Sequence, residues 1–197
     1  MYVDDIVIAG NDYRTIEKLK TFLDNQFKPK DLEKLKYFLG LEVARSRKGI
    51  SVSQRHNALQ LLSDSGFLGW KPTSTPMEAN INLSQDDGEL LEDPNLYRRL
   101  IGKLLYLTIT RPNLAYLVNR LTQYLASPRS TYLQGVHRIL QYIKGIVGQG
   151  LYFSATSSVH LKAFTDLDWG AYKDTRRSIS GFCVFLGDSL ISWKYKK

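Results

Sequence analysis

The spacing of apolar residues changes along the chain, and this change limits the folds that the chain can adopt. Between residues 97 and 149 apolar side chains recur at helical spacing, which predicts three amphipathic helices. From residue 150 they alternate with polar side chains in four short runs, which predicts an antiparallel β-meander. Both patterns occur before residue 71. A chain organised in this way is predicted to be α+β.

The first seventy residues combine strand-like and helix-like segments. An opening strand, residues 2–10, precedes an amphipathic helix that Asn11 and Asp12 can cap and that Pro29 ends. Two β-prone runs follow, and the basic, Gly-containing turn between them, residues 46–49, predicts a hairpin. A short helix is expected within residues 56–70.

An acidic connecting loop, residues 71–96, divides the chain. It concentrates Pro, Ser, Asn and acidic residues and shows no hydrophobic period. In the helical part beyond it, Pro112 lies at a first-turn position, Pro128 can close the second helix and Ser130 can cap the third.

Positive charge is concentrated in the second half of the chain. The whole chain has 27 Lys and Arg against 19 Asp and Glu, a net charge of +8. Residues 76–96 carry six acids and no base, whereas residues 97–163 carry nine Lys or Arg and no acid. Such a field attracts a polyanion. The alternative is that these side chains are simply solvated on the helix surfaces.

Composition and motifs exclude several classes of protein. The 197 residues, 43% of them hydrophobic, suffice for one good core or two small ones. No apolar run reaches the ~18 residues that a membrane-spanning helix needs, so we expect no membrane partner. The single cysteine rules out an internal disulfide framework. There is no Gly-rich phosphate loop and no zinc-type spacing, and we interpret the three histidines as structural or surface residues.

Two adjacent carboxylates, Asp4 and Asp5, interrupt the apolar opening strand. Neighbouring side chains of a strand point to opposite faces, so both could not be buried unpaired without a large cost. In a tight turn both could approach one place and bind a divalent cation such as Mg²⁺. A solvated turn, in which Asp favours the bend, is the other interpretation.

A series of motifs resembles one known family along essentially the whole chain. In order they are YVDD, DLEKLKYFLGLEV, KPTSTPM, YRRLIGKLLYLTITRPNLAY, HRILQYIKGIVGQGL, FTDLDWGAYKDTRRSISGFCVFLG and LISW. They resemble the second half of the reverse transcriptase of copia-type LTR retrotransposons, running into its RNase H domain. The chain is also similar to copia-derived open reading frames of plant nuclear and mitochondrial genomes.

The resemblance implies a division into four parts. Residues 1–70 would form a partial reverse-transcriptase palm with the primer-supporting hairpin and the start of the thumb. The connecting loop, residues 71–96, would lead to a basic helical thumb or connection at residues 97–149. Residues 150–197 would form a truncated RNase H-like domain containing the first antiparallel strands of its sheet.

The same resemblance implies roles for individual residues. Asp4 and Asp5 match the catalytic metal-binding pair of the palm, with Mg²⁺ or Mn²⁺ as the expected cofactor. Tyr2 and Val3 match residues near the primer end and the nucleotide. Asp166 matches the first catalytic and metal-binding carboxylate of RNase H. For Asp168 a role in a turn remains the preferred interpretation.

The basic helices would follow the backbone of an RNA or DNA template-primer without reading its sequence. The residues expected to contact phosphates are Arg98, Arg99, Lys103, Arg111, Arg138 and Lys144.

The family activity implied is RNA-directed DNA polymerase with RNase H. In the family, further acids of both sites come from segments outside this sequence, so we expect both sites to be incomplete and the isolated fragment to be inactive. The remaining part of the polyprotein is an expected partner. The alternatives are a non-catalytic basic nucleic-acid-binding module and a pseudogene product. The expected location is cytoplasmic or nuclear, within virus-like particles in the family, or mitochondrial if the chain is organelle-encoded.

Overall fold

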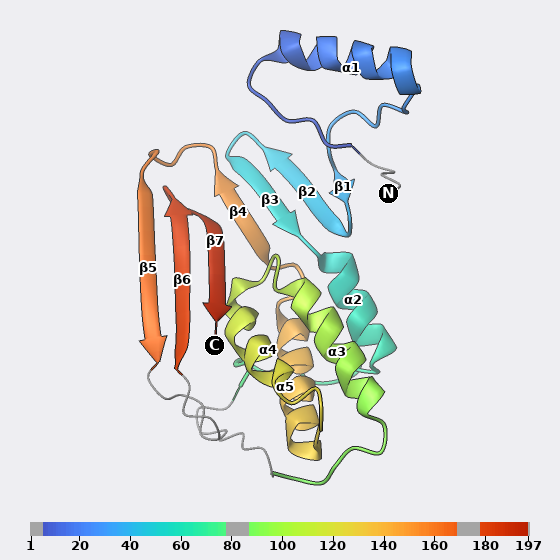
Figure 1. Cartoon of the computed structure of the whole chain (residues 1–197), viewed down its shortest axis with the longest axis vertical. Coiled ribbons are helices and arrows are strands. Elements are labelled where there is room, and N and C mark those ends of the chain that lie inside the picture. The colour runs from blue at the N-terminus through green and yellow to red at the C-terminus, as the bar shows by residue number, and fades with distance from the viewer. Residues whose placement is uncertain (1–5, 78–86, 169–177, 197) are drawn as a thin grey trace.

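The computed structural model describes residues 6–77, 87–168 and 178–196 (Figure 1). These residues form a mixed structure of helices and antiparallel strands, as predicted. The helices are α1 (Tyr13–Phe27), α2 (Arg55–Asp64), α3 (Pro94–Leu107), α4 (Pro112–Thr122) and α5 (Ser130–Gly145). The strands are β1 (Tyr37–Phe38), β2 (Leu41–Ser46), β3 (Gly49–Ser53), β4 (Gly150–Ser154), β5 (Leu161–Asp168), β6 (Ile179–Leu186) and β7 (Ser189–Lys196).

The hydrophobic core lies between helices α2, α3, α4 and α5. In α3, for example, Tyr97, Leu100, Ile101, Leu104 and Leu107 are buried, at the helical spacing that the sequence predicts. Each fully buried Leu or Ile side chain contributes roughly 1.5–3 kcal/mol of hydrophobic stabilisation. The three predicted helices of residues 97–149 are therefore confirmed, and their apolar stripes face one another.

Local signals set the starts of α3 and α4. The Asp93 side chain accepts a hydrogen bond from the Asn95 backbone N–H at 2.9 Å, and Pro112 occupies the first turn of α4 as predicted. The predicted cap of α5 is wrong. Arg129 is the cap residue, while the hydroxyl of Ser130 accepts from the backbone N–H of Glu89 at 3.2 Å. Ser130 thus fastens the connecting loop to the helix.

The first sheet contains the predicted hairpin, with strand order β1-β2-β3-β4 and antiparallel pairing throughout. Its fourth strand corrects the sequence analysis, which grouped residues 150–154 with the later strands. In the structure β4 pairs with β3, and Leu151 lies opposite Val52. A Cβ atom at Gly150 would lie 2.2 Å from the Val52 carbonyl oxygen, so glycine permits this close approach. Alternation identifies a strand but not its partner.

The second sheet is the remainder of the predicted meander, with strand order β5-β6-β7. Among its described residues Ile179 is the one buried large apolar side chain. The sheet is joined to β4 by a hydrogen bond from the Ser154 backbone N–H to Ser189 Oγ, 3.0 Å long. It meets α4 through the edge-to-face rings of Tyr116 and Tyr195. Both sheets are thus arranged around the helical core.

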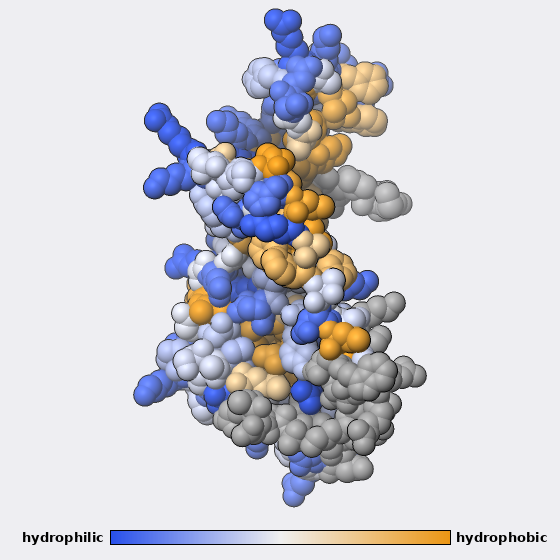
Figure 2. All heavy atoms as spheres, turned by 90° about the vertical axis from the view of Figure 1, so that its left-hand side faces the viewer, coloured by the Kyte–Doolittle hydropathy of each residue, from blue (hydrophilic) through white to orange (hydrophobic). Residues whose placement is uncertain are grey.

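Helix α1 stands apart from this core (Figure 1). Asp12 caps it as predicted, its side chain accepting from the Arg14 backbone N–H at 2.9 Å. None of its residues is buried, and several of its apolar side chains, including Phe22 and Phe27, remain exposed. Figure 2 shows apolar atoms gathered on one side of this uppermost part of the molecule.

The packing of α3 predicts a sharp contrast between two adjacent leucines. We expect Leu104→Ala to lower the free energy of unfolding by about 2–5 kcal/mol, because Leu104 is fully buried and truncation leaves a cavity. Leu105 is 41% exposed, so Leu105→Ala should cost less than about 1 kcal/mol. Urea unfolding followed by circular dichroism measures both. Equal losses would contradict this placement of the core.

Candidate functional site

The basic side chains of the helices bond mainly to backbone carbonyls of neighbouring loops. Arg98 of α3 donates from Nε to the Leu125 carbonyl at 2.9 Å and from Nη2 to the Ala126 carbonyl at 3.4 Å. Lys144 of α5 donates to the carbonyls of Leu68, at 2.6 Å, and Trp70. These bonds tie helix faces to the chain segments that follow α4 and α2.

Two further predicted phosphate-contacting residues also have partners within the protein. The Lys103 ammonium lies 2.6 Å from the Asp64 carboxylate, which joins α3 to the end of α2. Arg138 donates from Nη2 to the Thr75 hydroxyl at 3.1 Å. Carbonyl and hydroxyl oxygens serve as acceptors for most of these cations. Such acceptors allow Lys and Arg side chains of residues 97–163, a stretch with nine bases and no acid, to form hydrogen bonds within the protein.

Arg111 is fully buried, although the sequence analysis placed it among the phosphate-contacting residues. Its Nη2 donates to the Val147 carbonyl at 2.7 Å, whereas Nε and Nη1 have no partner among the described residues. Burial lowers the pKa of this guanidinium, and the charge of Glu42 opposes the shift. Arg111 therefore joins the start of α4 to the segment before β4 and presents no cation to solvent.

Exposed cations occur on several elements, and three of them lie on the hairpin tip and on α3. Arg47 and Lys48 form the tip between β2 and β3, and Arg99 projects from α3; all three are exposed. The structure shows no side-chain partner for any of them among its described residues. We call these three residues the exposed basic set.

Two contacts place the hairpin sheet against α3 and α2. The hydroxyl of Tyr106, near the end of α3, donates to the Leu39 carbonyl. Asn57 of α2 donates from Nδ2 to the Gly40 carbonyl at 3.1 Å. Gly40 has φ +75°, and a Cβ atom there would lie 2.5 Å from Asn57 Nδ2, so this turn requires glycine. The hairpin and α3 are therefore held in a fixed relation.

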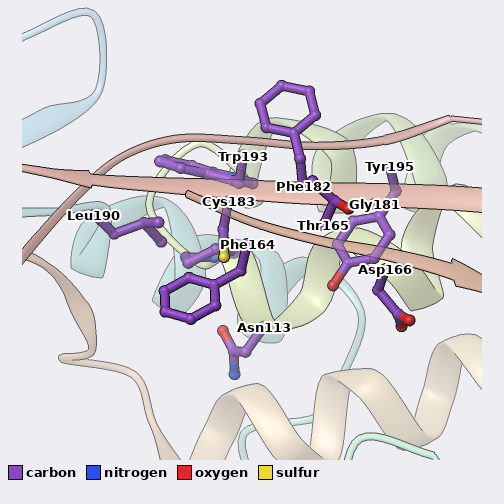
Figure 3. A pocket seen from close by; sticks show the side chains of 11 residues that line it. Asn113, Phe164, Thr165, Asp166, Gly181, Phe182, Cys183, Leu190, Trp193 and Tyr195 are labelled. Carbon is purple, nitrogen blue, oxygen red and sulfur yellow. The ribbon is translucent and has the colours of Figure 1, made fainter. Parts of the chain in front are cut away.

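Asp166 lies near the end of β5, beside a cavity of about 300 Å³ between the second sheet and the start of α4 (Figure 3). It pairs in register with Gly181 of β6, which in turn pairs with Tyr195 of β7. The Tyr195 ring covers Gly181, where a Cβ atom would be 2.8 Å from the ring. Figure 3 shows the Asp166 carboxylate next to this ring. The carboxylate is exposed, as expected at a sheet edge.

The described residues do not by themselves form a metal centre, since no group of three or more His, Cys, Asp or Glu side chains among them could hold an ion. Tyr2, Val3, Asp4 and Asp5 lie outside the described residues. Asp168 ends β5, and its side chain is outside them as well. Of the predicted metal ligands, Asp166 is the one that the structure places.

An aromatic cluster at the end of α2 was not identified from the sequence. The Phe67 ring is buried and stacks on Trp70 at a centroid distance of 5.1 Å. On α5, His137 lies 5.0 Å from the same Phe67 ring. This contact with a buried ring agrees with the interpretation of His137 as a structural or surface residue, and burial lowers the pKa of its imidazole. The cluster joins residues far apart in sequence, so no local pattern indicates it.

Comparison with known proteins identifies the family. A family model described as reverse transcriptase (RNA-dependent DNA polymerase) matches residues 1–79. The retrovirus-related Pol polyprotein from transposon RE1 of Arabidopsis thaliana is 41% identical over all 197 residues of this chain. An uncharacterised mitochondrial protein of the same plant is 38% identical over 197 residues, and the match covers 82% of its length. The chain belongs to the reverse transcriptase family of copia-type Pol polyproteins.

The match to the large members of this family is a match to one segment. The chain spans 13% of the RE1 polyprotein and 14% of the related RE2 polyprotein of the same plant, to which it is 39% identical. No solved structure matches the chain. Among the helices that the structure describes, none is long and apolar enough to cross a membrane.

Substitution of Arg111 tests its structural role. We expect Arg111→Ala to lower the free energy of unfolding by about 2–5 kcal/mol, because it leaves a cavity and an unpaired Val147 carbonyl. Arg111→Met should cost less, since it fills the space and removes the unpaired N–H donors. Urea unfolding measures both. An Arg111→Ala variant as stable as the parent would show that the side chain is not needed at this junction.

The lowered pKa of His137 predicts a pH dependence of stability. Because the unfolded state, with a histidine pKa near 6.5, binds a proton before the folded state does, the free energy of unfolding should fall as pH drops from about 7 to about 5. His137→Phe should weaken this dependence, whereas His160→Gln, at an exposed position, should leave it in place. Thermal unfolding at several pH values measures the change. An identical pH profile for His137→Phe and the parent would refute the assignment.

Proposed function

We propose that this chain is the part of an RNA-directed DNA polymerase that holds the template-primer, gripping its phosphate backbone without reading its sequence. The observation that carries the proposal is the exposed basic set: Arg47, Lys48 and Arg99 are free to meet phosphates. The match of residues 1–79 to the reverse transcriptase family supports the choice of ligand.

The contacts between the hairpin and α3 explain how one duplex could meet both. The bonds from Tyr106 and Asn57 hold the turn before β2 against the helices, so the sheet that carries the hairpin tip is joined to the helix that carries Arg99. This connection suits a regular phosphate backbone and lowers the entropy lost on binding. Arg98, Lys103, Arg138 and Lys144 act mainly by holding the helices in place. The charges of Arg98, Arg138 and Lys144 add to the field that attracts the polyanion, whereas that of Lys103 is paired with Asp64.

The carboxylates are the residues that we propose to bind the catalytic metal ions. Asp4 and Asp5 would hold Mg²⁺ or Mn²⁺, with Tyr2 and Val3 beside the primer end, and Asp166 would serve RNase H. A bound divalent ion supplies charge stabilisation for nucleotidyl transfer. Acids from further strands, provided by the remaining part of a polyprotein, would complete both sites.

Binding to poly(rA)/oligo(dT) at several salt concentrations tests the proposed contacts with the phosphate backbone. We expect affinity to fall steeply with salt, and Arg99→Ala to weaken binding and to reduce the slope of log K against log salt by about one. Arg47→Ala and Lys48→Ala should act similarly. Lys162→Ala is the matched control, because Lys162 lies on β5 and faces Asp188 at 3.9 Å. If Lys162→Ala and Arg99→Ala reduced affinity equally, binding would reflect general charge attraction and no specific binding surface.

Primer extension on the same samples, with Mg²⁺ or Mn²⁺, addresses chemistry separately. Extension that Asp4→Ala abolishes would show that the chain, with or without a second copy, completes a polymerase site. Salt-sensitive binding without extension would restrict the function of the isolated chain to holding nucleic acid. Absence of any binding by the parent chain at low salt would refute the proposed function.

A further inference from the structure

We infer that Trp70 is a stacking platform for one unpaired base of a bound nucleic acid. The inference rests on the proposed function and adds a specific contact for single-stranded nucleic acid. Trp70 follows α2, and its side chain is 53% exposed. One face of the indole lies on Phe67, with the two rings within 21° of parallel. The indole is therefore backed by protein on one side and still accessible.

The orientation of this indole is fixed from two directions. Phe67, only 5% exposed, anchors the stack in the core and is itself packed against His137 of α5. The Lys144 ammonium bonds the carbonyls of Leu68 and Trp70 and so holds the backbone on either side. A preorganised aromatic ring binds a base with little further loss of conformational entropy.

The charges around Trp70 fit a polyanion. Lys71 is exposed directly after it, and Lys144 contributes a second cation at its carbonyl. The acid at the end of α2, Asp64, is already paired with Lys103 at 2.6 Å. Phosphates flanking a base on the indole would therefore find cations close by. An uncharged aromatic ligand would gain nothing from them.

An unpaired base suits this platform better than a duplex. Bases inside a duplex already stack on their neighbours and expose no free face, whereas single strands can place a base on an aromatic ring. Every base has such a face, so the contact needs no sequence preference. The exposed basic set would hold the duplex backbone, and Trp70 would hold a single-stranded portion.

Binding of end-labelled oligo(dT) by fluorescence anisotropy tests this role. We expect Trp70→Leu to weaken binding by roughly 5- to 150-fold, the range that loss of one base-aromatic stack implies. Trp70→Phe keeps a π-face and should lose much less. Leu68→Ala is the matched control, because Leu68 is exposed two residues away and lacks a ring. Far-ultraviolet circular dichroism and a thermal midpoint establish that each variant is folded.

Tryptophan fluorescence gives an independent readout that does not require truncation at residue 70. The chain has three tryptophans, so the double variant Trp169→Phe, Trp193→Phe leaves Trp70 as the sole tryptophan, which can be excited selectively over tyrosine. Stacking of a base on the indole should quench its emission in proportion to bound oligo(dT). Bound oligo(dT) without quenching would overturn the inference.

The outcomes separate the two proposals. If the parent chain binds neither poly(rA)/oligo(dT) nor oligo(dT), the proposed function fails. If it binds both, and Arg99→Ala weakens the duplex complex while Trp70→Leu leaves oligo(dT) affinity unchanged, the inference about Trp70 alone fails. Equal weakening by Trp70→Leu of the binding of oligo(dT) and of a blunt-ended duplex, which has no unpaired base, would also reject a platform for unpaired bases.

Discussion

Burial of one apolar stripe from each of α2, α3, α4 and α5 is the constraint on which the rest of the structure depends. Nearly all of the buried apolar side chains that the structure describes belong to this cluster, and the second sheet adds Ile179. The strands therefore take their positions from contacts with the helices. Tyr106 fixes the turn before β2, and Tyr116 meets Tyr195 of β7. Loosening the helical cluster would release both sheets.

Cationic side chains that donate hydrogen bonds to backbone carbonyls both join loops to helices and keep their positive charge. A Lys–Asp ion pair removes net charge, but Arg98 or Lys144 bonded to carbonyl oxygens keeps its full positive charge. The same side chains can therefore tie loops to helices and maintain a field that draws a polyanion toward the surface. An acid-free sequence is what this arrangement requires, because acidic partners would hold the helices equally well and cancel the field.

Local patterns in the sequence predicted the elements well and their long-range partners poorly. Helical spacing placed α3, α4 and α5, and the turn at residues 46–49 gave the hairpin. The partner of β4 could not be predicted, because β3 lies about a hundred residues earlier and alternation carries no pairing information. Burial of Arg111 was missed for a similar reason: its acceptor, Val147, follows the next helix. The Asp4–Asp5 pair came from a motif, and the structure describes neither residue.

Helix α1 differs from the other helices in what maintains it. It has 15 residues, a length at which an isolated helix is marginal in water, and it buries none of them. The hydrogens of its backbone amides would exchange with solvent through opening of this helix alone. Those at buried positions of α3 would exchange only through global unfolding. The exchange rates of the α3 amides thus serve as an internal reference for those of α1. Any chain that covers the apolar side of α1 would slow exchange at residues 13–27 and leave the rates in α3 unchanged.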